Sequence, residues 1–241
     1  MKQIIFIFII LISFSASGQE KNAVWDYPVK PGSEEWKMTS YAEKVDKSQP
    51  PKELLSSWDT ETLFKYCLDY PFNKVILLFN NPNDGFKRVY EQSSVWQEFI
   101  HRIDASDIYS KYVESLPYNL LFDIQDVEIR NSKLFTLFFL EKIVSETDFT
   151  DHLDSSSKRK LANTILQCHQ SKKDYPNEFY GFPYNSSLSA LLRILESDKV
   201  ITLNDEISLA KFREKTENES FVDDNLDSAI VNKVINYINK Q

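Results

Sequence analysis

The chain has 241 residues and a formal net charge of −8, from 36 acidic and 28 basic side chains. Its acidic balance repels the phosphate backbone of nucleic acids, so we expect no nucleic-acid partner. The four glycines are scattered, whereas a dinucleotide fingerprint or a P-loop needs several close together; these classes are therefore excluded.

The N-terminus has the three regions of a secretory signal peptide, which we assign to residues 1–18. Lys2 supplies the positive charge, residues 4–14 are apolar apart from Ser13, and small residues precede a cleavage point after Gly18. The apolar run is shorter than the roughly 20 residues that a spanning helix needs. We therefore expect export to the periplasm or the extracellular space, with no membrane span after cleavage.

Residues 19–37 are predicted to form an extended N-terminal arm. The segment carries Trp25, Tyr27 and Trp36 together with Pro28 and Pro31, and proline resists helix formation. Its large apolar side chains would favour aggregation if they stayed in water, so we expect the arm to be ordered as a strap across the helices. The alternative is that the arm docks onto a neighbouring copy or a partner and is then the interaction site.

Residues 38–241 are predicted to form a single all-α domain, an irregular multi-helix arrangement for which a solenoid-like stack is one option. Ser40 and Glu43 have the spacing of a capping box, and Asn81 precedes Pro82 as the cap of another helix. The apolar run at residues 134–140 predicts a buried central helix, with Leu134, Leu137, Phe138 and Leu140 inside. Residues 75–79 and 200–203 are the two places where a minor strand pair would contradict the all-α prediction.

Three segments carry a resemblance: WDYPVKPGSEEW at residues 25–36, SWDTETLFKYCLDYP at 57–71 and NPNDGF at 81–86. Together they resemble a family of uncharacterised exported bacterial proteins that open with a WDYPVKPG-type segment. The resemblance implies export and an all-helical domain. No activity, cofactor or catalytic residue is known for that family, so none is carried over.

Motifs for common catalytic sites are absent from the sequence. It has no G-x-S-x-G elbow, no H-E-x-x-H and no C-x-x-C, so we predict no metal site and no cofactor. Cys168 and His169 are neighbours and would point about 100° apart on a helix, which prevents them from pairing. The remaining enzymatic alternative is a secreted hydrolase that uses carboxylates or Cys67.

Two aromatic segments are the candidate binding residues. One is the arm with Trp25 and Tyr27; the other is the proline-containing loop with Phe179, Tyr180, Phe182 and Tyr184. Aromatic side chains in irregular segments can stack on sugars or anchor a partner, although they more often pack on the protein's own core. We therefore predict an exported helical binding domain that recognises a protein, a peptide or a glycan, and favour this over an enzyme.

Overall fold

The computed structural model describes residues 24–116, 121, 123–175, 182–218 and 222–240. The predicted signal peptide lies outside these residues. Within them the protein is helical and contains no strand, which confirms the all-α class. The described part also contains no helix that is both long and apolar enough to cross a membrane.

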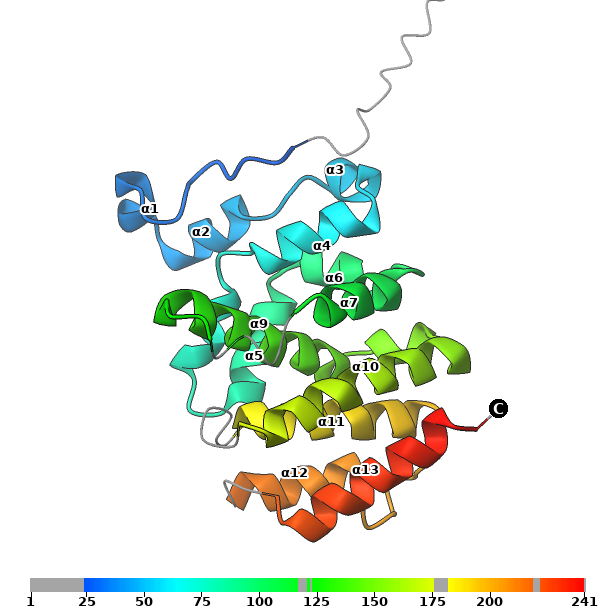
Figure 1. The fold of residues 1–241 in the computed structure, drawn as a ribbon. Coiled ribbons are helices and arrows are strands. Elements are labelled where there is room, and N and C mark those ends of the chain that lie inside the picture. Colours follow the sequence, from blue (N-terminus) through cyan, green and yellow to red (C-terminus); the bar gives the residue numbers. More distant parts are fainter. Residues whose placement is uncertain (1–23, 117–120, 122, 176–181, 219–221, 241) are drawn as a thin grey trace, which may run out of the picture.

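The helices of the N-terminal half are short and lie at one end of the molecule, in blue to green in Figure 1. They are α1 (Glu34–Met38), α2 (Tyr41–Lys47), α3 (Lys52–Ser57), α4 (Thr60–Leu68), the 3-10 helix η1 (Asn73–Leu78), α5 (Pro82–Glu91), α6 (Ser94–Ile100) and α7 (Ala105–Glu114).

Longer helices form the C-terminal half. They are α9 (Val127–Glu146), the 3-10 helix η2 (Phe149–His152), α10 (Ser155–Lys173), α11 (Phe182–Ser197), α12 (Leu209–Asn218) and α13 (Asp224–Ile238). Figure 1 shows the chain descending in layers, from α1–α4 through α6, α7 and α9 to α12 and α13. The helices follow one another along the molecule as in a stack. Their lengths range from 5 to 20 residues, however, so the layers do not form a regular repeat.

Side-chain caps explain where many of these helices begin. Ser40 and Glu43 form the predicted capping box at α2, and Asn81 caps α5 with Pro82 at the first helical position. Aspartates cap α4, α9, α10 and α13, where their carboxylates accept hydrogen bonds from the first-turn amides. Each cap satisfies amide groups that have no partner within the helix.

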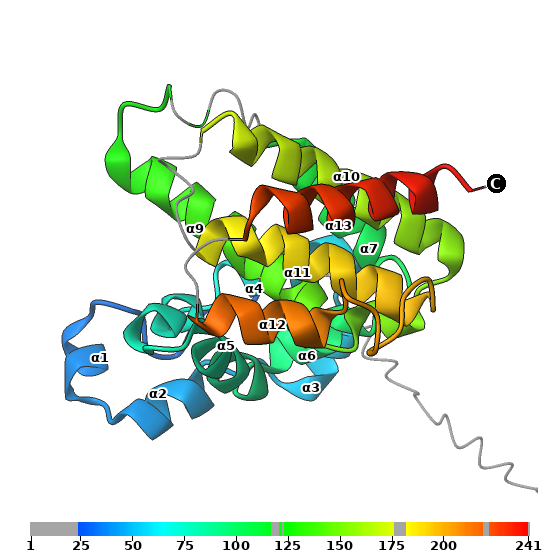
Figure 2. The same cartoon turned by 90° about the horizontal axis from the view of Figure 1, so that it is seen from below.

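The core is centred on α11 rather than on the middle of α9. α11 packs against α9, α10, α12 and α13, and Figure 2 shows it between α12 and α13 when the molecule is viewed from below. Leu188, Leu191 and Leu195 are fully inaccessible. In α9, full burial begins only at Leu137; Leu134, which was predicted to be buried, is partly buried and packs against the core.

One segment differs from its predicted secondary structure, and a second, which was ambiguous, is helical as the all-α class predicts. Residues 34–37 were expected to be extended. Instead, the side chain of Ser33 accepts a hydrogen bond from the Trp36 N–H and caps α1, which begins inside the predicted arm. Residues 75–79 fall in η1 and its end instead of a strand; Leu77 and Leu78 face solvent there, 56% and 81% exposed. A strand in a packed sheet would bury at least one of two neighbouring apolar side chains.

Candidate functional site

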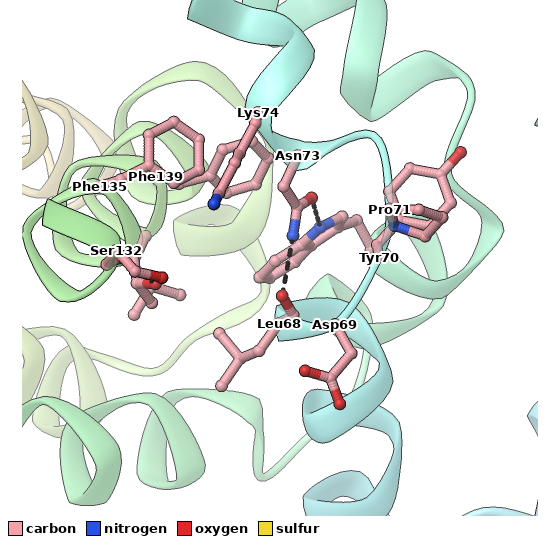
Figure 3. A pocket seen from close by; sticks show the side chains of 12 residues that line it. Leu68, Asp69, Tyr70, Pro71, Asn73, Lys74, Ser132, Phe135 and Phe139 are labelled. Carbon is pink, nitrogen blue, oxygen red and sulfur yellow. Dashed lines mark hydrogen bonds between the residues drawn. The ribbon is translucent and has the colours of Figure 1, made fainter. Parts of the chain in front are cut away.

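A pocket of about 290 Å³ lies between the turn that follows α4 and the N-terminal part of α9. Figure 3 shows this pocket, with Ser132 and Phe135 of α9 on one side and Leu68 and Asp69 on the other. The volume is at the lower end of the range for small-molecule pockets, so it suits one side chain or a group of similar size. Its lining residues are Leu68, Asp69, Tyr70, Pro71, Asn73, Lys74, Trp96, Ser132, Phe135, Thr136, Phe139 and Leu140.

Asn73 holds together the part of the pocket wall that comes from α4, η1 and α6. Its side-chain Nδ2 donates to the carbonyls of Cys67 (2.8 Å) and Leu68 (3.2 Å), and its Oδ1 accepts from Trp96 Nε1 at 2.9 Å. These bonds join the end of α4 to η1 and α6, and Figure 3 draws those from Asn73 to Leu68 and from Trp96 to Asn73. Because Asn73 is buried and its amide is engaged on both sides, the pocket wall is preformed.

Gly85 allows η1 to approach α5 closely. A Cβ at this position would lie 2.7 Å from the carbonyl oxygen of Ile76 and 2.9 Å from its Cα, both backbone atoms. Only glycine fits there, so the position of η1, and with it Asn73 and Lys74, depends on this contact.

Charged and apolar groups occur together at the pocket opening. Asp69 and Lys74 are exposed and carry opposite charges, while Phe135 is partly buried. The remaining aromatic rings are inaccessible: Trp96 is 0% exposed and Phe139 is 2% exposed. A sugar ring needs an open aromatic face for stacking, which neither of these two rings provides.

Exposed apolar side chains lie on both elements that border the pocket. Leu77, Leu78 and Phe79 follow Lys74 along η1, and Val127 and Ile129 precede Ser132 on α9; their exposures lie between 39% and 81%. Large apolar side chains that remain in water near a pocket are typical of an interaction surface.

The candidate residues of the arm pack onto the protein's own surface. The Trp25 N–H donates to the Tyr66 hydroxyl at 2.6 Å, and that hydroxyl donates to the Trp25 carbonyl at 3.1 Å. Tyr27 is half-buried; burial, and then the charge of Asp69, raise the pKa of its phenol well above the usual range. Val29 is 3% exposed, so the arm lies on α4 as a strap, and Tyr27 lies close to one wall of the pocket without lining it.

The second aromatic segment is only partly described. Phe179 and Tyr180 lie outside the described residues, and Phe182 falls in the first turn of α11, where its side chain is not described. Tyr184 is half-buried, its hydroxyl donates to the carboxylate of Asp227, and its ring lies 4.8 Å from that of His169. The hydroxyl and the ring of Tyr184 therefore both contact buried residues of the protein itself.

A buried serine–histidine–aspartate network surrounds Tyr184 and was not predicted from the sequence. His169 Nδ1 lies 2.8 Å from Ser187 Oγ, and His169 Nε2 lies 3.3 Å from Asp227 Oδ2. Burial lowers the pKa of His169, and Nε2 donates to the Asp227 carboxylate, which can only accept. Ser187 and His169 are 0% exposed, and a nucleophile must be reached by its substrate, so this network joins α10, α11 and α13 structurally.

The two cysteines are also buried. Cys67 is a free thiol that donates to the carbonyl of Val95 at 3.2 Å, and burial raises its pKa well above the usual value. A thiol is a poor nucleophile under these conditions. Cys168 donates to Glu141 at 3.4 Å while His169 faces Ser187, so the two neighbours point to different partners, as the helical spacing predicts.

Comparison with family models, with curated proteins and with solved structures gave no match. The resemblance to exported bacterial proteins therefore stays a prediction from the sequence.

Proposed function

We propose that the chain is an exported binding domain that recognises a peptide or a protein segment by inserting an apolar side chain into the pocket between η1 and α9. Export rests on the signal-peptide pattern at residues 1–18, which leads to the periplasm or the extracellular space. The observation that carries the binding role is the group of exposed apolar side chains on both bordering elements.

A peptide fits this surface better than a glycan. Phe135 and the exposed residues of η1 offer apolar contact, whereas the pocket's Trp96 and Phe139 do not present open faces to a sugar. Burying one large apolar side chain contributes about 1.5–3 kcal/mol. Asp69 and Lys74 at the opening can pair with the charged groups of a peptide, which fixes its orientation more than its affinity.

A hydrolase is less well supported. The thiol of Cys67 is buried with a raised pKa, and the Ser187–His169–Asp227 network is inaccessible. Neither arrangement brings a nucleophile to the pocket of Figure 3.

The experiment is a selection of random displayed peptides on the purified protein, followed by affinity measurements in solution by fluorescence polarisation. Ser132→Trp places a large ring at an exposed position that lines the pocket, and we expect it to weaken binding at least about tenfold, which is about 1.4 kcal/mol. Ser56→Trp is the matched control, since Ser56 is also exposed, on α3, and does not line the pocket.

Two results would contradict the proposal. One is that the selected peptides lack apolar residues. The other is that Ser132→Trp and Ser56→Trp bind them equally well.

A further inference from the structure

Two of the chain's three histidines converge on one carboxylate, away from the pocket of Figure 3. His101 Nε2 lies 3.6 Å from Asp148 Oδ2, and His152 Nε2 lies 3.4 Å from the same oxygen. The ligand atoms of the three residues all lie within 4.8 Å of one another. The sequence shows no metal-binding spacing, because His101 comes from the end of α6 while Asp148 and His152 bracket η2.

Buried packing holds these two segments together. Phe149, the first residue of η2, is 0% exposed and stacks on Phe99 of α6 with ring centroids 6.2 Å apart. Asp148 and His152 are four residues apart, so the turn of η2 brings their side chains to the same side. The cluster is therefore built on two packed elements.

A hydrogen bond also orients the His101 ring. Its Nδ1 lies 2.7 Å from the carbonyl oxygen of Gln97, which can only accept, so Nδ1 carries the proton. The lone pair of the neutral ring is then on Nε2, the atom that faces Asp148. A backbone carbonyl that fixes the tautomer in this way is the usual outer partner of a metal-binding histidine.

The two distances are compatible with a metal site. A charge-assisted hydrogen bond between an imidazolium and a carboxylate is about 2.7–2.9 Å long, shorter than both distances found here. In a tetrahedral zinc site with bonds of about 2.0–2.1 Å, neighbouring ligand atoms lie about 3.3 Å apart. The observed 3.4 and 3.6 Å are close to that separation.

We propose that His101, Asp148 and His152 bind one divalent transition-metal ion of the zinc type. Imidazole nitrogens favour such ions over Mg²⁺ and Ca²⁺, which prefer oxygen ligands alone. The three side chains are about half-exposed, at 49–53%, so an ion can enter from solvent. Three protein ligands leave one tetrahedral position for water or for a donor group of a bound molecule. A bound ion would also link the end of α6 to η2.

The test uses purified protein without a histidine tag, titrated with Zn²⁺ by calorimetry and with Co²⁺ by visible absorption. We expect one equivalent of Zn²⁺ to bind, a Co²⁺ spectrum typical of tetrahedral coordination, and a rise in melting temperature on addition of Zn²⁺. His101→Gln, His152→Gln and Asp148→Asn each remove one ligand from an exposed position, and each should weaken binding about 10–100-fold or more and remove the Zn²⁺-dependent rise.

Asp151→Asn is the matched control. Asp151 lies on the same 3-10 helix, but its carboxylate pairs with Arg193 at 2.8 Å, so this variant should keep the wild-type affinity. The proposal is overturned if the protein binds no stoichiometric Zn²⁺, or if His152→Gln and Asp148→Asn bind it as tightly as the wild type and Asp151→Asn do.

Discussion

The carboxylate of Glu141 in α9 holds the amine of Lys172 in α10 with both oxygens, at 2.7 and 2.6 Å, although the two residues are 31 positions apart. Both side chains are at most 2% exposed. The hydroxyl of Ser186 in α11 donates to the same carboxylate. One buried acid therefore joins three of the long helices.

Breaking this pair should be costly. Lys172→Met leaves the Glu141 carboxylate buried without its ammonium partner, and we expect it to lower the free energy of unfolding by about 3–5 kcal/mol. The double replacement Glu141→Met with Lys172→Met removes both charges and should recover most of that loss. Urea unfolding of the three proteins measures this; a double variant no more stable than the single one would contradict it.

Stability should fall as the solution becomes acidic. Burial lowers the folded-state pKa of His169, so the unfolded chain, with an ordinary value of about 6.5, binds more protons below that pH. The stabilisation is therefore complete above about pH 6.5 and is lost as the pH falls toward the folded pKa. Urea unfolding between about pH 7.5 and about pH 5 should show the decline.

His169→Gln should flatten the pH dependence of stability over this range, because the buried ring is then absent. Asp227 adds a second loss at lower pH. Burial opposes its ionisation, but hydrogen bonds from His169, Lys173 and Tyr184 hold its pKa below the usual range. A pH slope that is unchanged in His169→Gln would show that another group causes it.

Gly85→Ala should destabilise the protein although alanine favours helices. The added Cβ meets backbone atoms of Ile76 at 2.7 and 2.9 Å, so η1 and α5 must separate. We expect a net loss of about 1–3 kcal/mol, from overpacking offset in part by the gain of about 1 kcal/mol in helix propensity. Gly32→Ala is the contrasting variant. The φ of +85° at Gly32 disfavours alanine, but nothing lies within 4 Å of its Cβ position, so the substitution strains its own backbone without a clash.

The two glycine variants should differ in their affinity for the selected peptides. Gly85→Ala moves the element that carries Asn73 and Lys74, so it should also weaken the selected peptides, while Gly32→Ala should leave them unaffected. Equal effects of the two variants on peptide affinity would contradict the assigned role of the η1–α5 contact.

The N-terminal arm should act as a strap. Tyr66→Phe removes the hydroxyl that both accepts from and donates to the Trp25 backbone, and it keeps the ring that stacks on Trp58 at 4.2 Å. We expect a loss of about 1–3 kcal/mol. Deleting residues 19–32 should lower the melting temperature further without changing the mass in solution; a change in oligomeric mass would instead show that the arm holds a partner copy.

Local signals made much of the fold predictable. The capping box of Ser40 with Glu43 and the Asn81–Pro82 start depend on neighbours along the chain, and the structure has both. The segment at residues 75–79 was ambiguous because its burial is decided by α5, which approaches through Gly85. The burial of Leu134 was overestimated for the same reason: the apolar run does not reveal where the neighbouring helices end.

The candidate sites were less predictable than the helices. His101 and Asp148 are brought together by the Phe99–Phe149 contact, and Ser187 meets His169 only through the packing of α10 on α11. The pocket likewise combines the turn after α4 with α9, more than 50 residues apart. No short sequence motif predicts such contacts. Trp25 and Tyr27 were proposed as binding residues because they are aromatic, and in the structure they pack on α4.

The most direct test of the proposed function is to map a selected peptide on the protein by amide chemical-shift perturbation. We predict that the perturbed amides cluster at residues 68–74 and 132–140, the two segments that form the pocket, together with residues 77–79. Perturbations confined to the arm at residues 25–36, or to the surroundings of Tyr184, would contradict the assignment of the pocket as the binding site. They would indicate that the aromatic segments bind the peptide.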